Sequence, residues 1–384
     1  MHSFFVGPKI YYGCHSLEHL KELKIKRACI VTDKMMVQLG MTERIATILQ
    51  GATCTVFSDV EPNPSLETVK KGLTIFLEDE PELVIALGGG SPIDTAKAIL
   101  FFSHQAREKI SFTHTIKKPM FIAIPTTSGT GSEVTSYSVV TDTKNNVKIP
   151  LSDEHMLPDA VILDEELTKT VPPSVTADTG MDVLTHALEA YVSPKATECT
   201  DIYAERAIQY VFTYLLRAYR FGNDLDARGK LHLASTMAGI AFNNASLGIT
   251  HSLAHAVGAK FHLSHGKSNA ILLPYVIHFN GGLCDGSYHR SETAEKYTKI
   301  ANMLGLPCST REEGVKSLAA AVEVFNGKLG IPTTFREALI DENLYMGKIP
   351  ELVKNAQQDM CTAGNPKTTG GEDFINLLKW AYNG

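Results

Sequence analysis

The first half of the chain alternates short apolar runs with amphipathic stretches, and this alternation limits the fold more than any other feature. The runs are rich in β-branched residues and are mostly followed by turn residues. Continuous apolar runs of this length are typical of strands buried on both faces of a parallel sheet. Amphipathic stretches such as residues 66–79 separate them, so the sequence predicts a doubly wound α/β domain. The expected strands cover 28–32, 53–57, 83–87, 120–124 and 160–164.

The second half has a different texture, which begins after Pro172 and Pro173. Few strand-like runs occur there, and apolar residues recur at helical spacing over long stretches. A double proline favours a hinge between domains, and 384 residues suit two domains. We therefore expect an α/β plus all-α protein: a Rossmann-like parallel-sheet domain over residues 1–173 and an all-helical domain over 174–384. The expected helices of the second half cover 176–192, 199–219, 228–246, 291–304, 313–328 and 372–382.

Charge and cysteine usage exclude several classes of protein. The formal net charge of −6 argues against nucleic acid as a partner. No stretch approaches the length of about 20 apolar residues that a membrane helix needs, and the first residues do not resemble a secretory signal. The 7 cysteines are scattered and form no CxxC pair. They predict reduced thiols in a cytoplasmic protein, and any metal must rely on histidine and carboxylate ligands.

A glycine turn after the expected strand 83–87 is the first candidate binding site. In GGGSPIDTAK (88–97), the glycines allow a tight turn and the close approach of a ligand. Ser91 suits the N-cap of a following helix, Asp94 completes a capping box, and Lys97 adds a nearby charge. A helix that begins here favours a phosphate or pyrophosphate. A well-capped strand–turn–helix without a ligand explains the turn equally, and the pattern is not the GxGxxG of a standard Rossmann fingerprint.

A second polar turn, PTTSGTGSE (125–133), directly follows the expected strand 120–124. Thr126 and Thr127 could contact phosphate, ribose or nicotinamide. A plain polar loop is the alternative for this turn alone. Two such turns at the carboxyl ends of strands favour a nucleotide site, because open α/β sheets place ligands at that edge.

The helical half carries a candidate metal site without cysteine. Asp182 and His186 are four residues apart on an expected helix and therefore share a face. The segment 250–266 adds His251, His255 and two further histidines, His262 and His265. One carboxylate with several imidazoles suits iron(II), zinc(II) or a similar divalent ion. The spacing alone does not select which histidines are ligands.

Five segments together resemble the iron-containing (group III) alcohol dehydrogenase family. They are GGGSPIDTAK, PTTSGTGSE, GMDVLTHALE (180–189), GITHSLAHAVGAKFHLSHG (248–266) and Asn365–Pro366, and they span nearly the whole chain. The wording TGMDVLTHALEAYVSP (179–194) is most similar to the propanol and butanol dehydrogenase branch, and it also resembles the alcohol dehydrogenase half of bifunctional aldehyde–alcohol dehydrogenases. The resemblance implies a dehydroquinate synthase-like fold with a dinucleotide domain and a helical metal-binding domain.

The same resemblance assigns roles to individual residues. It implies a metal held by Asp182, His186, His251 and His265, and it leaves His255 beside the nicotinamide and substrate. There His255 is the candidate catalytic residue, which either relays a proton or only orients the site. Asp33 matches the acidic position that binds the adenosine ribose; a carboxylate there repels a 2′-phosphate, so we expect NAD over NADP. The implied cofactor surface also includes Asn63, Gly89, Gly90, Ser91, Asp94, Thr126, Thr127, Val139 and Lys148.

The function implied is hydride transfer between NAD(H) and a short-chain primary alcohol or aldehyde, with iron(II) or zinc(II) as the metal. A diol dehydrogenase, similar to 1,3-propanediol or lactaldehyde reductases, is one alternative. A dehydroquinate synthase-like lyase that uses NAD and a metal is another, and a non-catalytic metal-storage scaffold is the third. The resemblance also implies a homodimer in the cytoplasm or in a bacterial microcompartment, with an aldehyde dehydrogenase as a candidate partner.

Overall fold

A computed structural model describes residues 3–110, 118–144 and 147–384, without the side chains of 107–110. The chain divides into two compact units. One is formed by Val6–Thr170, and the other by Val171–Gly384 together with residues 3–5. The domain bounds 1–173 and 174–384 stay a prediction; the helix that opens the second unit, α5, begins at Pro173.

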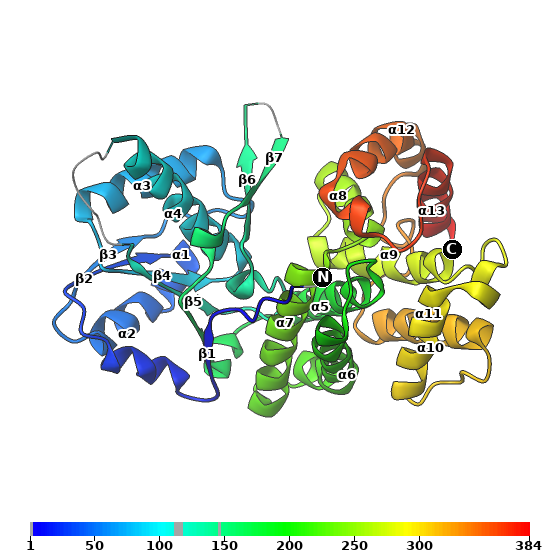
Figure 1. Cartoon of the computed structure of the whole chain (residues 1–384), viewed down its shortest axis with the longest axis horizontal. Coiled ribbons are helices and arrows are strands. Elements are labelled where there is room, and N and C mark those ends of the chain that lie inside the picture. The colour runs from blue at the N-terminus through cyan, green and yellow to red at the C-terminus, as the bar shows by residue number, and fades with distance from the viewer. Residues whose placement is uncertain (1–2, 111–117, 145–146) are drawn as a thin grey trace. The chain divides into compact units, whose positions relative to one another are not determined.

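The first unit contains a six-stranded sheet in the order β1-β8-β5-β4-β2-β3, in which every pairing is parallel (Figure 1). This confirms the predicted doubly wound α/β class. The central strand β4 (Leu83–Gly88) is buried throughout, as its uninterrupted apolar run requires. The other strands are β1 (Lys9–Tyr12), β2 (Arg27–Val31), β3 (Thr53–Phe57), β5 (Met120–Pro125) and β8 (Ala160–Leu163).

Helices cover both faces of this sheet because alternate strand residues point to opposite sides. Ile85 and Leu87 pack with Ile45 of α2 (Met41–Ile48) and with Leu20 of the short helix η1 (Ser16–Glu22). The helices α3 (Leu66–Asp79) and α4 (Gly90–Ile110) lie together and cover the opposite face (Figure 1). An antiparallel hairpin, β6 (Tyr137–Asp142) and β7 (Val147–Ser152), follows β5. The unit also contains α1 (Lys34–Gln38), η2 (Ser132–Val134), η3 (Glu154–Met156) and η4 (Glu165–Thr168).

The second unit is helical across the part of it that the structure describes, as its periodicity predicted. Its central helix α5 (Pro173–Val192) is buried along nearly its whole length and packs against α6, α7 and α9. Gly180 allows one of these contacts, because a Cβ there would lie 2.3 Å from Cδ1 of Leu215. The other long helices are α6 (Glu198–Arg220), α7 (Leu225–Ala245), α8 (Ile249–Phe261), α9 (His265–Asn280), α10 (Glu292–Met303), α11 (Arg311–Lys328), α12 (Glu342–Gln358) and α13 (Gly371–Asn383), with η5 (Ser287–Arg290) and η6 (Met360–Gly364) between them.

No helix among the described residues combines the length and the apolar composition needed to cross a membrane. All 7 cysteines are free, as their scattered spacing predicted.

Candidate metal centre and nucleotide-binding loops

The predicted nucleotide-binding turns meet at one edge of the parallel sheet. The strands β5, β4 and β2 are neighbours, so their carboxyl ends lie side by side. The Thr32 hydroxyl donates a 2.8 Å hydrogen bond to the carbonyl of Leu87, and the Thr126 amide donates a 3.0 Å bond to the carbonyl of Gly88. Asp33 follows β2 at the same edge, where its carboxylate caps α1 by accepting from the Met36 amide at 3.0 Å.

The glycine turn owes its composition to the second turn packed against it. Gly88 has a φ of 142°, which favours glycine. A Cβ on Gly89 would lie 3.1 Å from Oγ1 of Thr127, and one on Gly90 would lie 2.8 Å from Cγ2 of Thr130. Helix α4 begins at Gly90, one residue before the N-cap expected at Ser91. The glycines therefore let the two turns touch, and Ser91 lies in the first helical turn.

Asp94 and Lys97 of α4 hold the second turn (125–133) in place through hydrogen bonds. Asp94 accepts a 2.6 Å hydrogen bond from the Ser132 hydroxyl and a 3.1 Å bond from the Val139 amide. Lys97 is fully buried and donates to the carbonyl oxygens of Ser132 and Tyr137 at 2.5 and 2.8 Å. Burial raises the pKa of Asp94 and lowers the pKa of Lys97 to about 8. The Lys97 amine is thus held by oxygen atoms of the protein itself, and the charge that it adds for a phosphate stays a prediction.

The remaining predicted cofactor residues lie around the hairpin. The Thr141 amide donates a 2.8 Å hydrogen bond to the carbonyl of Pro64, which brings the loop of Asn63 beside β6. Asn63 is exposed and has a φ of 55°. Val139 on β6 and Lys148 on β7 are also exposed. Their part in cofactor binding, like that of the two turns, stays a prediction.

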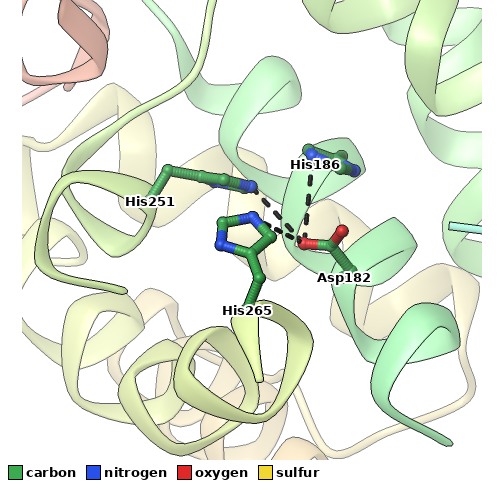
Figure 2. A group of neighbouring side chains, drawn as sticks. All are labelled: Asp182, His186, His251 and His265. Atoms are coloured by element: carbon green, nitrogen blue, oxygen red, sulfur yellow. Dashed lines mark ion pairs between the residues drawn. The ribbon is translucent and has the colours of Figure 1, made fainter. Parts of the chain in front are cut away.

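Three histidine side chains of the helical unit converge on one carboxylate oxygen of Asp182, as Figure 2 shows. Asp182 and His186 come from α5, His251 from α8 and His265 from the first turn of α9. The Oδ1 atom of Asp182 lies 3.3 Å from Nε2 of His265, 3.6 Å from Nε2 of His251 and 3.9 Å from Nε2 of His186. One donor atom from each residue lies within 4.8 Å of the others. These four residues, which we call the primary donor set, are the four that the family resemblance selected.

Close helix packing brings His265 into the primary donor set. A Cβ on the next residue, Gly266, would lie only 2.0 Å from the backbone oxygen of Asp178. Helices α5 and α9 can approach this closely only because that position is glycine. Asn269, one turn along α9, donates a 2.7 Å hydrogen bond to Oδ1 of Asp182.

Glu189 orients His251 and was missed by the sequence analysis. Its carboxylate lies 2.6 Å from Nδ1 of His251, and it also accepts from the amides of Thr250 at 2.6 Å and Gly248 at 2.8 Å. A carboxylate on the second nitrogen of a histidine fixes the ring and its tautomer for metal binding. The sequence contains Glu189 within GMDVLTHALE, but only the fold shows that it reaches His251.

The primary donor set places one carboxylate, that of Asp182, among three imidazoles, and these groups shift one another's pKa values. Burial opposes the charged form of Asp182, yet the histidines around it hold its pKa well below the usual value. Burial likewise opposes charge on His251, but Glu189 and Asp182 raise its pKa to about 9. Burial and the neighbouring histidines lower the pKa of His265 to about 3, so the set favours one positive charge beside Asp182 and opposes a second.

A divalent metal fits this arrangement. The Nε2 atom of His251 is buried and has no hydrogen-bond partner among the residues that the structure describes, which is costly unless another group satisfies it. That atom faces Asp182, and its ring is held from behind by Glu189. Three imidazole nitrogens and one carboxylate oxygen suit iron(II) or zinc(II).

His255 lies beside the primary donor set without belonging to it. Its ring stacks on that of His265 with centroids 5.1 Å apart, and its side chain is 33 % exposed. Its Nδ1 atom lies 2.7 Å from Oδ2 of Asp359. Like Glu189, Asp359 was not predicted from the sequence. The catalytic role of His255 stays a prediction. His262 ends α8 with a φ of 55° and lies outside the donor set.

Comparison with known proteins agrees with this geometry. The family model described as "Iron-containing alcohol dehydrogenase" matches residues 7–165, and "Fe-containing alcohol dehydrogenase family, C-terminal" matches residues 176–382. The chain belongs to the iron-containing alcohol dehydrogenase family.

Curated relatives fall into two groups by length. The chain is 41 % identical to the NADPH-dependent butanol dehydrogenase of Clostridium saccharobutylicum, over 100 % of this chain and 99 % of that protein. It is 40 % identical to the 1-propanol dehydrogenase PduQ of Citrobacter freundii, over 99 % of each. It is 43 % identical to the aldehyde-alcohol dehydrogenase of Streptococcus pneumoniae over 98 % of this chain, but it spans only 45 % of that longer protein.

Solved structures of the same architecture cover the whole chain. A 1,3-propanediol oxidoreductase matches with a TM-score of 0.88 at 30 % identity, over 100 % of both chains. A sulfoacetaldehyde reductase from Bifidobacterium kashiwanohense, solved in complex with NAD+, matches with a TM-score of 0.86 at 27 % identity, over 100 % of this chain and 99 % of that one.

Proposed function

We propose that the chain is a metal-dependent alcohol dehydrogenase that transfers hydride between NAD(H) and a short-chain primary alcohol or aldehyde, such as propanol and propanal or butanol and butanal. The observation that carries this proposal is the primary donor set, with its buried and unsatisfied His251 nitrogen. The match to butanol and propanol dehydrogenases over the full length of both chains supports the substrate class.

Asp182, His186, His251 and His265 would hold the metal. When bound, the ion supplies Lewis acidity that lowers the pKa of an alcohol or polarises an aldehyde carbonyl, and NAD(H) accepts or donates the hydride. Glu189 keeps the His251 ring in the orientation that ligation requires. Asn269 steadies the Asp182 carboxylate through its side-chain amide.

His255 would handle the proton. Asp359 accepts the Nδ1 proton of His255, which leaves Nε2 as the free acceptor. In alcohol oxidation, Nε2 would take up the proton lost from the hydroxyl, and it would return that proton during aldehyde reduction.

The two turns at the carboxyl ends of β4 and β5 (88–97 and 125–133), which we call the sheet-edge turns, would bind the dinucleotide. Gly89, Gly90 and Ser91 would face the pyrophosphate at the start of α4, and Thr126 and Thr127 would contact the cofactor from the second turn. Asp33 would accept from the ribose hydroxyls and repel a 2′-phosphate, so we propose NAD(H) as the preferred cofactor. One relative is named as NADPH-dependent. The cofactor preference therefore cannot be taken from the family and must be tested on this chain.

A diol dehydrogenase is the second candidate, favoured by the match to a 1,3-propanediol oxidoreductase. We also propose a cytoplasmic or microcompartment homodimer. Because the chain matches less than half of the aldehyde-alcohol dehydrogenase, an aldehyde dehydrogenase is a candidate partner.

The proposal is tested by anaerobic reduction of short aldehydes with NADH, on protein loaded with iron(II) and, in parallel, with zinc(II). We expect the highest kcat/KM for propanal or butanal, and a clear dependence on the metal. A higher kcat/KM for 3-hydroxypropanal would select the diol alternative. No net NADH oxidation with any aldehyde would overturn the proposal; consumption of an anionic sugar-acid substrate without net NADH change would instead support a dehydroquinate synthase-like lyase.

A further inference from the structure

A second group of donor side chains lies where α8 packs against η6. It consists of His255, Asp359 and Cys361, and one donor atom from each lies within 4.8 Å of the others. We call these residues the secondary donor set. It shares no residue with the primary donor set, although the His255 ring stacks on that of His265. It differs in chemistry as well, because it contains a sulfur atom.

The backbone that carries the secondary donor set is held in place. Asp359 caps η6, and its Oδ1 atom accepts a 2.8 Å hydrogen bond from the amide of Cys361. The Thr362 hydroxyl lies 2.7 Å from that of Ser252 on α8. Asn365, at the end of the same segment, accepts from the Ile249 amide at 3.4 Å. Contacts on both sides of Cys361 therefore fix the segment against the helix that carries His255, and such support is what a defined ligand site needs.

We propose that His255, Asp359 and Cys361 form a second metal site that selects zinc(II) over iron(II). One thiolate, one imidazole and one carboxylate make a three-ligand zinc set that leaves a fourth position for water. The soft sulfur ligand favours zinc, whereas the primary donor set, with nitrogen and oxygen alone, accepts either metal.

Occupation of this site has a defined proton balance. The thiol of Cys361 loses its proton to solvent when its sulfur binds the ion, and the imidazole of His255 binds through an unprotonated nitrogen. Burial raises the pKa of the Cys361 thiol well above its usual value. The primary set offers four donor residues and the secondary set three, so we expect the secondary set to fill after the primary set as free zinc rises.

Zinc at the secondary set would engage the two partners of the His255–Asp359 hydrogen bond. If His255 handles the substrate proton, as proposed above, excess zinc inhibits the enzyme by occupying that residue. This consequence rests on the proposed function, but binding of the second ion does not.

The test is a metal titration of the metal-free full chain under anaerobic conditions, with zinc(II) for stoichiometry and cobalt(II) as a spectroscopic probe. We expect two zinc ions per chain, and a thiolate-to-cobalt charge-transfer band that grows with the second equivalent only. Cys361→Ser and, independently, Asp359→Asn are expected to bind one ion. Cys361→Ser should also lose the band, while the matched control Cys199→Ser, at an exposed cysteine, keeps both ions and the band.

His251→Ala gives the reciprocal result: one ion, with the charge-transfer band present from the first equivalent. Binding of a single ion by the wild-type chain, or two ions and an unchanged band in Cys361→Ser, would overturn the proposal. Because stoichiometry and the band are measured without any alcohol or NADH, they remain decisive even if the chain proves to lack dehydrogenase activity.

Discussion

The sheet-edge turns and the primary donor set are both partly buried polar regions, but they satisfy their polar groups in opposite ways. At the sheet edge, Asp94 and Lys97 form hydrogen bonds with backbone groups and hydroxyls of the protein itself. At the primary donor set, the Nε2 atom of His251 has no hydrogen-bond partner within the described part of the chain. In the first region, these two side chains are satisfied by the protein and hold the turns in place, so the backbone of the turns is the part available to a ligand. The second is a set of side chains whose donor atoms suit a cation.

The largest effect is expected when a ligand of the primary donor set is removed. His251→Ala should lower metal affinity by more than about 100-fold, the upper range for residues that only support a ligand, and turnover should be lost with the metal. NADH binding should survive, because the turns belong to the other compact unit. Metal analysis and NADH fluorescence titration measure the two effects separately.

The control for this variant is His289→Ala, at an exposed histidine of η5. Turnover with bound metal in His251→Ala would remove His251 from the ligand set. Loss of NADH binding together with the metal would break the contrast between the two regions.

A smaller loss is expected from Glu189→Gln, which keeps the shape of the side chain but removes its charge from the His251 nitrogen. Supporting carboxylates of this kind are worth roughly 10–100-fold in metal affinity. Competition with a chelator measures the change, and Glu198→Gln, at an exposed position of α6, is the matched control. An unchanged affinity would show that Glu189 serves only the amides of Gly248 and Thr250.

Helix packing at the primary donor set is tested by Gly266→Ala. The added methyl group would collide with the backbone of Asp178, and overpacking of this kind costs about 1–3 kcal/mol. We expect a lower melting temperature and weaker metal binding. Gly327→Ala in α11 meets nothing within 4 Å and should raise stability by about 0.5–1 kcal/mol. Equal effects of the two substitutions would contradict the close approach of α5 and α9.

The smallest effect is expected at the sheet edge, in Asp33→Ser. Serine can still cap α1, as the carboxylate does through Met36, so the helix should remain intact while the negative charge is lost. We expect kcat/KM for NADPH relative to NADH to rise about tenfold, which corresponds to about 1.4 kcal/mol. An unchanged NADPH-to-NADH ratio of kcat/KM in a correctly folded variant would show that Asp33 does not select NAD.

The two regions also differ in how far the sequence predicted them. The sheet-edge turns are contiguous motifs at the ends of apolar strands, so their positions followed from local pattern. The strand β1 (Lys9–Tyr12) was missed because it lies at the edge of the sheet, is only partly buried and has no long apolar run. The hairpin was missed because its strands mix apolar with polar residues and are only partly buried. The hydrogen-bond partners of Lys97 were not predicted because they lie 35 or more residues further along the chain.

At the primary donor set, spacing alone predicted Asp182 and His186 on one helix face but left the other histidines open. The family resemblance was needed to select His251 and His265. Glu189 and Asp359 escaped both approaches, because each meets its histidine only through tertiary packing: Glu189 is 62 residues from His251, and Asp359 is 104 residues from His255.

The central claim is that the primary donor set holds the ion on which alcohol oxidation and aldehyde reduction depend. The most direct measurement is an anaerobic titration of the metal-free chain with iron(II), in which NADH-linked reduction of propanal is followed at each addition. We expect a rate that rises in proportion to bound iron and reaches its plateau at one ion per chain. Full turnover by the metal-free chain, or a rate unaffected by bound iron, would contradict this claim.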